Sequence, residues 1–499
     1  MSVVMSLVGI VVLLAIAYLL SANKKAINFR TVGGAFAIQA IFGGFVLYVP
    51  VGKDILKGVS DAVYSVIQKA NVGIEFLFGG LAQFKLGFIF VIHVLPVIIF
   101  FSSLIAVLYY LGIMQWVIRI IGGALQKALG TSRTESMSAT ANIFVGQTEA
   151  PMVVRPFIPK MTESELFAIM VGGMASIAGS VMAGYAQMGV PMEYLVAASF
   201  MAAPGGLLMA KIMQPEDKAP HDDVGEIEED PDAPSNVLDA AASGASSGMH
   251  LALNVGAMLL AFIALIALIN SIISSIGFMF GYGDGAVQAA FAALQSVAAA
   301  APDLQAAFDA NIAELAKQAG VTVANLSITD VDRDLLANQA GELAKLPALH
   351  DSATALVNAA SDKISLEMIL GYIFMPLAWL IGVPWNESML AGSFIGQKII
   401  VNEFVAYSNF APYLKDVVDG GKLVAETGLV MTDKTKAIVS FALCGFANLS
   451  SIAIMLGGLG AMAPSRRHDI ARLGMRAVIA GSLANLMSAT IAGLFVAIS

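Results

Sequence analysis

The chain has 499 residues, of which 58% are hydrophobic and 13% charged, and its mean hydropathy is +0.80. Soluble domains contain about 45–50% apolar and about 25% charged residues, so this composition excludes an ordinary soluble domain and predicts a membrane protein. The net charge of −9 provides no basic face for phosphates, which argues against a nucleic-acid partner, and the single cysteine, Cys444, excludes a disulfide within the chain.

Apolar runs long enough to cross a bilayer, which takes roughly 20 residues, recur along the chain. We predict eight spanning helices, over residues 3–20, 32–51, 86–114, 165–187, 193–211, 249–275, 435–462 and 475–498. The first run has no basic residue before it and no small-residue cleavage site after it, so it is predicted to be a retained helix. Two further apolar stretches, 136–159 and 366–408, contain polar residues and prolines in mid-run and are predicted to be re-entrant hairpins.

Lysine and arginine in the short loops predict the orientation of these helices, since such loops gather on the cytoplasmic side. With eight spans and two re-entrant hairpins, the basic loop residues all fall on one side, which places both termini outside. The residues are Lys24, Lys25, Arg30, Arg119, Lys127, Arg133, Arg155, Lys160, Lys211, Lys218, Arg466, Arg467 and Arg472. The acidic stretch Glu216–Asp232 also falls inside, and acidic residues contribute little to this rule.

Residues 284–363 differ in kind from the rest of the chain. The segment is rich in alanine, carries four basic and ten acidic residues (4 − 10 = −6), and reads as several short helices. Its place between predicted spans makes it extracytoplasmic. It is interpreted as a solvated helical appendage, and docking of a partner is the alternative.

The order of elements repeats within the chain. A long helix (86–114), a broken segment (136–159) and two helices are followed by a second long helix (249–275), a second broken segment (366–408) and two more helices. The two units begin on opposite sides of the membrane, which is the inverted repeat typical of secondary transporters. Such proteins bind substrate and ions where helices unwind, and the matching interruptions here are Asn142–Pro151 and Pro384–Glu387. The next helix of each unit is also predicted to be interrupted, at Ser176–Ser180 and at Gly445–Ser451.

Three motifs bring polar groups to these interruptions. In the first, Gly146–Pro151, the carboxylate of Glu149 would cost about 2.5–3.5 kcal/mol at membrane depth unless it has a partner or a ligand. Gln147 offers donors and an acceptor that suit the edge of a heterocyclic base, and Thr148 adds a hydroxyl. A solvated turn outside the membrane is the alternative interpretation.

The second motif is Val383–Glu387, where Pro384 interrupts the helix and Glu387 stands beside the interruption. An ionised carboxylate can accept both hydroxyl hydrogens of a sugar diol, and the alternative is that Glu387 is a helix cap at a hairpin tip. In the third motif, Cys444–Ser451, Asn448 and Ser451 share a helix face and Phe446 could cover a ring, while ordinary interhelical hydrogen bonds are the alternative.

A monovalent cation could bind where the chain leaves helical geometry near Asn142 and Val145 and again at Ser176 and Ile177. Unwound carbonyls and neutral side-chain oxygens are suitable ligands for a hard cation. Ordinary packing of small residues is the alternative interpretation.

Three motifs in order along the chain resemble the concentrative nucleoside transporters. They are Gly-Gln-Thr-Glu-Ala-Pro (146–151), Val-Asn-Glu-Phe-Val-Ala-Tyr (401–407) and Leu-Cys-Gly-Phe-Ala-Asn-Leu-Ser-Ser-Ile (443–452). The resemblance covers about residues 1–283 and 364–499 and is closest to the sodium-coupled bacterial branch. It implies a homotrimer, each protomer having a scaffold domain and a mobile transport domain with two hairpins.

Carried over to this sequence, the resemblance implies roles for individual residues. Gln147 and Thr148 would bind the base beside Glu149, and Val181 would pack on it. Glu387, Asn448 and Ser451 would hold the ribose, and Phe446 would line the pocket. Asn142, Val145, Ser176 and Ile177 match the family's sodium site, which favours sodium over protons.

These observations predict an all-α membrane protein, a sodium:nucleoside symporter of the bacterial inner membrane that works by alternating access. The predicted segments are 1–85 (two spans and an interfacial segment, scaffold), 86–213 (first repeat), 214–248 (acidic cytoplasmic loop), 249–283 (scaffold helix), 284–363 (insertion) and 364–499 (second hairpin and last helices). A proton-coupled symporter is the alternative within the family. A nucleoside-binding membrane enzyme or receptor is disfavoured because the sequence offers no nucleophile–base pair or metal cluster, and an open channel is disfavoured by the paired interruptions.

Overall fold

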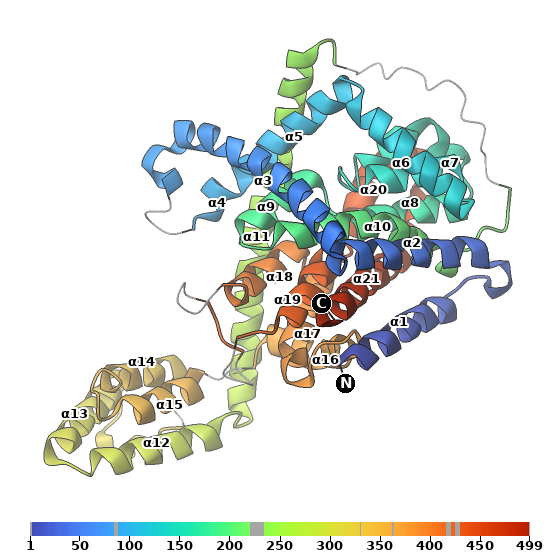
Figure 1. The fold of residues 1–499 in the computed structure, drawn as a ribbon. Helices are drawn as coiled ribbons and strands as arrows, with labels where there is room; N and C mark the ends of the chain where they lie inside the picture. Colours follow the sequence, from blue (N-terminus) through green and yellow to red (C-terminus); the bar gives the residue numbers. More distant parts are fainter. Residues whose placement is uncertain are drawn as a thin grey trace. The chain divides into compact units, whose positions relative to one another are not determined.

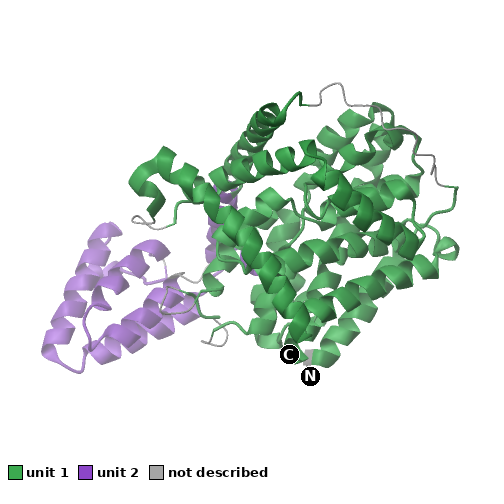
Figure 2. Cartoon of the chain, turned by 45° about the horizontal axis from the view of Figure 1, so that its top comes forward, with its two compact units in different colours: residues 1–262, 370–499 green, residues 263–369 purple. Residues whose placement is uncertain are grey.

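A computed structural model describes residues 2–83, 88–219, 234–329, 331–361, 364–415, 421–424 and 430–498. The chain forms two compact units (Figure 2). One comprises residues 1–262 and 370–499, and the other comprises residues 263–369. Each unit is described by itself.

Helices make up nearly all of the first unit (Figure 1). Its first half contains α1 (Ser2–Leu19), α2 (Phe29–Leu47), α3 (Pro50–Phe78), α4 (Phe90–His93), α5 (Leu95–Tyr110), α6 (Ile113–Leu129), α7 (Arg133–Ala141), the 3-10 segment η3 (Ala150–Lys160), α8 (Glu163–Ala175), α9 (Gly179–Gln187) and α10 (Met192–Met213). Its second half contains α17 (Trp385–Ile400), α18 (Glu403–Phe410), α19 (Asp433–Leu443), α20 (Ser450–Met462) and α21 (Arg467–Ile498). Two helices continue across the boundary between the units, α11 (Val237–Met279) and α16 (Leu366–Leu380).

All eight predicted spans coincide with helical segments, although the start of the span at 86–114 lies outside the described residues. In the described part of the chain, six helices are long and apolar enough to cross a membrane: Phe29–Leu47, Phe90–Tyr110, Glu163–Gln187, Met192–Met213, Val237–Met279 and Pro464–Ile498. The predicted span 3–20 corresponds to a shorter apolar helix, α1, and the predicted span 435–462 is divided into α19 and the shorter apolar helix α20. The composition therefore predicted where the helices lie, while the number of crossings stays a prediction.

The centre of the first unit is formed by α8, α10 and α21, which pack on one another and are almost entirely buried. Small residues allow their backbones to approach closely. A Cβ atom added at Gly481 of α21 would lie 3.0 Å from the Cβ atom of Met174 in α8. Helices α1 and α19 both pack against α21. The first helix of the chain and a helix of the second repeat therefore contact the last helix.

Two helices are amphipathic rather than uniformly apolar. Along α3, buried positions recur every three to seven residues, and the exposed positions include both charged residues such as Lys53 and Asp54 and large apolar ones such as Val72 and Phe76. The sequence reading did not separate α6 from the span before it. Gly112, at φ +76°, turns the chain between α5 and α6, a backbone conformation that glycine adopts without steric cost.

The repeat predicted from the sequence is present in the order of elements. After α5 come α6, α7, a non-helical break, η3, the broken pair α8 and α9, and α10. After α11 come α16, α17, a break at 401–402, α18, the broken pair α19 and α20, and α21. The interruption predicted at Pro384–Glu387 is a bend of 117° between α16 and α17. By element order, the counterpart of the break at 142–149 is instead the break at 401–402.

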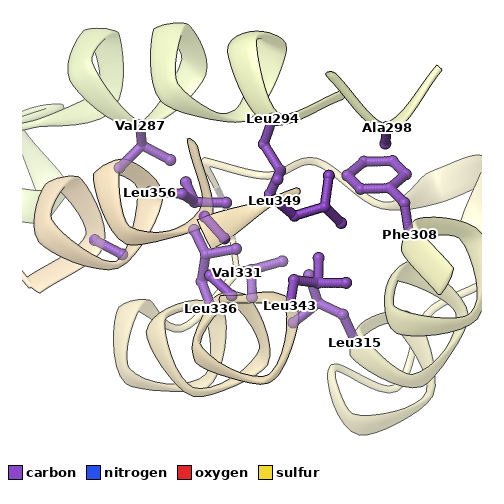
Figure 3. Packing of buried hydrophobic residues seen from close by; sticks show 13 residues of the cluster. Val287, Leu294, Ala298, Phe308, Leu315, Val331, Leu336, Leu343, Leu349 and Leu356 are labelled. Atoms are coloured by element: carbon purple, nitrogen blue, oxygen red, sulfur yellow. The ribbon is translucent and has the colours of Figure 1, made fainter. Parts of the chain in front are cut away.

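The second unit has its own hydrophobic core (Figure 3). Helices α12 (Asp284–Ala298), α13 (Pro302–Gln318), α14 (Arg333–Leu343) and α15 (His350–Ser361) surround it. Leu294, Phe308, Leu349 and Leu356 point toward one another there, and the Arg333 guanidinium pairs with the Asp284 carboxylate. Residues 284–361 form four short α-helices, with residues 330, 362 and 363 outside the description. Of the predicted acidic loop, 214–248, residues 220–233 also lie outside it.

Candidate functional site

The first hairpin begins at a well-capped helix and ends its helical part at residue 141. Ser132 and Glu135 form a capping box at the start of α7, so the helix begins at a fixed residue. After Ala141 the chain turns repeatedly before η3 starts. Gly146 lies in these turns, and a Cβ atom there would lie 2.4 Å from Oε2 of Glu149. Only glycine at position 146 therefore leaves the Glu149 carboxylate where it is.

Two spanning segments are also broken, at corresponding places in the two repeats. Helix α8 ends at Ala175, Ser176 is extended with φ −108° and ψ 171°, and α9 starts at Gly179. Helix α19 ends at Leu443, and α20 starts at Ser450. Both interruptions were predicted from the sequence. Backbone groups released by such breaks need partners when they are buried.

Main-chain hydrogen bonds join these breaks to one another. Within the first repeat, the amide of Gly179 donates to the carbonyl of Phe144 over 3.0 Å. Within the second, the amide of Leu449 donates to the carbonyl of Ile399 over 3.2 Å. Between the repeats, the amide of Phe446 donates to the carbonyl of Ser176 over 3.1 Å. The unwound segments therefore satisfy one another and form a single connected structure.

A pocket of about 610 Å³, counting space open to solvent, lies at these breaks. Its lining combines an apolar wall with a set of polar groups from both repeats. The apolar wall consists of Ala178, Val181, Leu251, Val255, Met258, Phe404, Phe446 and Ile454. The other lining residues are Gly146, Gln147, Thr148, Glu149, Asn402, Glu403, Asn448, Ser450 and Ser451. This combination suits a small ligand with one flat face and several hydrogen-bonding groups.

Glu403 is the carboxylate of the second repeat in this pocket. Its side chain is buried and accepts hydrogen bonds from the hydroxyl of Tyr185, over 3.1 Å, and from Nδ2 of Asn448, over 2.9 Å. Asn402 caps α18 by accepting from the amide of Val405, which fixes Glu403 in the first turn of that helix. Oδ1 of Asn448 accepts from the amide of Ser451, so Asn448 is held on both sides.

The first repeat contributes Gln147 and Thr148 to the same pocket. Nε2 of Gln147 donates to Oγ of Ser451 over 3.3 Å, whereas Oε1 of Gln147 is buried and finds no hydrogen-bond partner among the described residues. A buried amide oxygen without a partner is costly unless a ligand or water supplies a donor. The pocket therefore has a free acceptor on Gln147 at one end and a carboxylate, Glu403, on the other repeat.

The predicted binding residues divide into two groups. Seven of them line the pocket: Gln147, Thr148, Glu149, Val181, Phe446, Asn448 and Ser451. Glu387 does not. Its carboxylate accepts hydrogen bonds from the amide of Thr432, over 3.1 Å, and from the hydroxyl of Thr432, over 2.8 Å. Because Thr432 is the N-cap of α19, Glu387 ties the start of α17 to the start of α19, as in the alternative reading of a helix cap.

The sequence reading missed Glu403 although the motif at 401–407 contains it. The signal available was an Asn-Glu pair inside an apolar run, where Asn402 predicts a helix start and Glu403 an expensive charge. The prominent proline at position 384 drew attention to the bend between α16 and α17 rather than to the break at 401–402.

The four residues predicted for a cation lie at the joined breaks of the first repeat. Asn142 is buried, and its Nδ2 donates to the carbonyl of Ser138, while its Oδ1 has no hydrogen-bond partner within the described residues. The carbonyl of Ser176 already accepts from Phe446. Val145 and Ile177 are buried beside them. Oδ1 of Asn142 is the oxygen here most in need of a donor or a cation.

Comparisons with known proteins agree with this arrangement. Family models described as the C-terminus and N-terminus of Na+-dependent nucleoside transporters match residues 194–301 with 337–493 and residues 8–81, and a nucleoside-recognition gate model matches residues 91–192. An uncharacterized transporter of Haemophilus influenzae is 54% identical over 99% of this chain and 98% of its own. The nucleoside permease NupC of Helicobacter pylori is 43% identical over the same shares. The structure of CNTnw in an inward-facing, substrate-bound state is similar with a TM-score of 0.79, at 50% identity, covering 100% of this chain and 99% of that one.

Proposed function

Because the chain belongs to the Na+-dependent nucleoside transporter family, we propose that it imports nucleosides across the bacterial inner membrane by sodium-coupled symport. The observation that carries the proposal is the pocket in which polar groups of both repeats meet across an apolar wall. A nucleoside has a flat base at one end and a sugar diol at the other. The two sets of polar groups in this pocket complement those two ends.

The base end of the ligand is assigned to the first hairpin. Gln147 presents an unpaired amide oxygen and an NH2 group whose bond to Ser451 is long enough, at 3.3 Å, to be exchanged for a ligand. Such an amide can accept from and donate to the edge of a base at once, and the hydroxyl of Thr148 lies beside it. Val181 and Phe446 supply apolar surface for the faces of the ring.

The sugar end is assigned to the second repeat, and here the carboxylate is Glu403 in place of Glu387. Glu403 lines the pocket and is held by Asn448, whereas Glu387 is engaged with Thr432 outside it. A carboxylate accepts two hydroxyl hydrogens from a diol, and such charge-assisted bonds are worth about 1.5–3 kcal/mol each. Asn448 and Ser451 complete the set of groups around the sugar.

The coupled cation is assigned to the break of the first repeat. Asn142 and Ser176 with the carbonyls at Val145 and Ile177 would supply neutral oxygens to sodium, which is carried together with the nucleoside. The Gly179–Phe144 hydrogen bond joins this break to the one that bears Ser176. A cation that orders these turns also orders Gln147 five residues beyond Asn142, so sodium and nucleoside strengthen each other's binding reciprocally. Proton coupling is the alternative.

In the membrane we propose eight crossings with both termini outside, and two re-entrant hairpins formed by α7 with η3 and by α17 with α18. The hairpins and the broken helices form a transport domain that moves past a scaffold containing α11, giving access to each side in turn. The transporter assembles as a homotrimer through that scaffold. Residues 284–361 are an extracytoplasmic appendage.

The test is uptake by the purified protein in liposomes. Labelled uridine should accumulate under an inward sodium gradient, and replacing sodium by choline at fixed pH should abolish accumulation. Uptake that persists in choline but requires a pH gradient would replace sodium by protons. Chromatography of the accumulated label should return unmodified uridine, and a modified product would favour an enzyme. Competition by a panel of unlabelled nucleosides gives the base preference.

A further inference from the structure

The proposed function leaves one buried charge of the site region without a role. Lys398, in the last turn of α17, is 2% exposed. Burying an ammonium group inside a membrane protein is expensive unless it is paired. Its Nζ donates to Oδ1 of Asn485 in α21 over 2.6 Å.

Asn485 connects this ammonium to the ends of two broken helices. Its Nδ2 donates to the carbonyl of Ala175, the last residue of α8, over 2.6 Å, and to the carbonyl of Cys444, just after α19, over 2.8 Å. A hydrogen bond from a cation to Oδ1 polarises the amide and strengthens both donations. Gly445 leaves room for the amide, since a Cβ atom there would lie 2.4 Å from Oδ1 of Asn485.

Three negative helix ends therefore converge around one positive charge. The C-termini of α8 and α19 are reached through Asn485, and α17 ends two residues after Lys398. Each helix C-terminus acts as about −0.5 charge, so the three ends together amount to about −1.5. The carboxylate of Glu403 follows Lys398 by five residues, in the first turn of α18 after the break. A site of this kind attracts a cation.

The two repeats differ at this point. In the first repeat, residues 138–145 at the end of α7 and in the turns after it read Ser-Ala-Thr-Ala-Asn-Ile-Phe-Val, with no basic residue. In the second repeat, the equivalent end of α17 carries Lys398. The first break must take its positive charge from solution, whereas the second has a charge that is covalently attached.

We propose that the ammonium of Lys398 is a fixed cation that neutralises the break of the second repeat, as a mobile monovalent cation neutralises the break of the first. Through Asn485 it neutralises the helix ends and positions Glu403 for the ligand. The second repeat then needs no ion from solution, and a single mobile cation accompanies each nucleoside. The comparison with a mobile cation rests on the proposed function.

The experiment measures nucleoside binding by purified wild-type protein, Lys398→Met and Lys398→Ala at several sodium concentrations. Methionine fills the space of the lysine without its charge, and alanine leaves space. We expect Lys398→Met to bind nucleoside at least about tenfold more weakly, the loss expected when a charge at buried helix ends is removed. Lys398→Ala should be equally weak, and methylammonium should restore its binding while leaving Lys398→Met unchanged. The sodium dependence of the wild type should have a Hill coefficient of about one.

A purely structural role for Lys398 would give a different pattern. Binding of wild-type strength by Lys398→Met would overturn the inference, and so would a folded Lys398→Ala that methylammonium does not restore. A Hill coefficient near two for the wild type would show that a second mobile cation is bound. Thermal melting and size-exclusion chromatography establish that each variant is folded. Wild-type protein that binds no nucleoside would instead count against the proposed function.

Discussion

Exchanging the two carboxylates of the second repeat for amides, one at a time, tests the site most directly. Glu403→Gln and Glu387→Gln are the same chemical change, and both carboxylates are buried and accept two hydrogen bonds. Glu403 lines the pocket, and Glu387 does not. A difference between the variants therefore reports on contact with the ligand.

The structure predicts the sizes of the two effects. In Glu403→Gln, one oxygen becomes an NH2 group that faces donors from Tyr185 or Asn448, and the charge that strengthens the sugar bonds is lost. The loss of about 3 kcal/mol, from bonds of about 1.5–3 kcal/mol each, weakens nucleoside binding about 100-fold. In Glu387→Gln, the amide oxygen still accepts one bond from Thr432, so the cost is about 1 kcal/mol of folding stability, with nucleoside affinity nearly unchanged.

Isothermal titration of both variants with uridine at saturating sodium, together with thermal melting, gives the two quantities separately. We expect Glu403→Gln to lose uridine binding and Glu387→Gln to retain it, while both variants lose melting temperature because each amide keeps only one of the two accepted hydrogen bonds. The reverse pattern, in which Glu387→Gln loses uridine binding and Glu403→Gln keeps it, would refute the assignment of the sugar end.

Three further predictions concern other parts of the structure. Gly458→Ala should weaken nucleoside binding about tenfold or more, because its Cβ atom would lie 2.6 Å from Cγ2 of Thr148 and overpacking costs about 1–3 kcal/mol. Gly457→Ala, where the space is open, is the matched control. Equal effects of the two substitutions on binding, measured by titration, would contradict the reasoning. Asn142→Ala should raise the sodium concentration for half-maximal uptake about tenfold with the maximal rate retained, and an unchanged sodium curve would remove Asn142 from the cation site. Arg333→Ala should destabilise the second unit by about 1–2 kcal/mol, since it removes the partner of Asp284, whose partial exposure lets water solvate the carboxylate. Limited proteolysis should then cut within residues 284–361, while uridine binding by the rest of the chain stays at the wild-type level.

The fold was largely predictable because bilayer-spanning helices leave a strong compositional signal. Runs such as 193–211 are predominantly apolar between the charged residues at their two ends, and α10 covers that run within a few residues. The break near Gly146 was equally visible, since Gln147 and Glu149 interrupt an apolar stretch. The break between α19 and α20 was visible in the same way, because Asn448 and Ser451 interrupt an apolar run. In each case, a polar group at an expensive depth marked the place.

The second hairpin was harder to predict because a proline can either interrupt a helix or mark the start of one. Pro384 does mark an interruption: it is the N-cap residue of α17, at the bend between α16 and α17, a position where its missing N–H costs nothing. A second break, after Ile400, contains neither proline nor glycine and is marked only by the capping residue Asn402. The choice of Glu387 followed from the bend at Pro384, whereas Glu403 follows the second break. Which side chains share a pocket depends on such long-range contacts, which spacing along the sequence does not give.

The hydrogen bonds that join the breaks at Phe144, Ser176 and Ile399 to their partners have a thermodynamic consequence. In the proposed transport cycle, a pocket tied together by main-chain bonds would keep its shape as it is carried from one face of the bilayer to the other. Its affinity for nucleoside would then be the same on both faces. The direction of net flux would be fixed by the combined gradients of the coupled ion and the nucleoside, so inverting the ion gradient across nucleoside-loaded vesicles should make the same molecule export what it had imported.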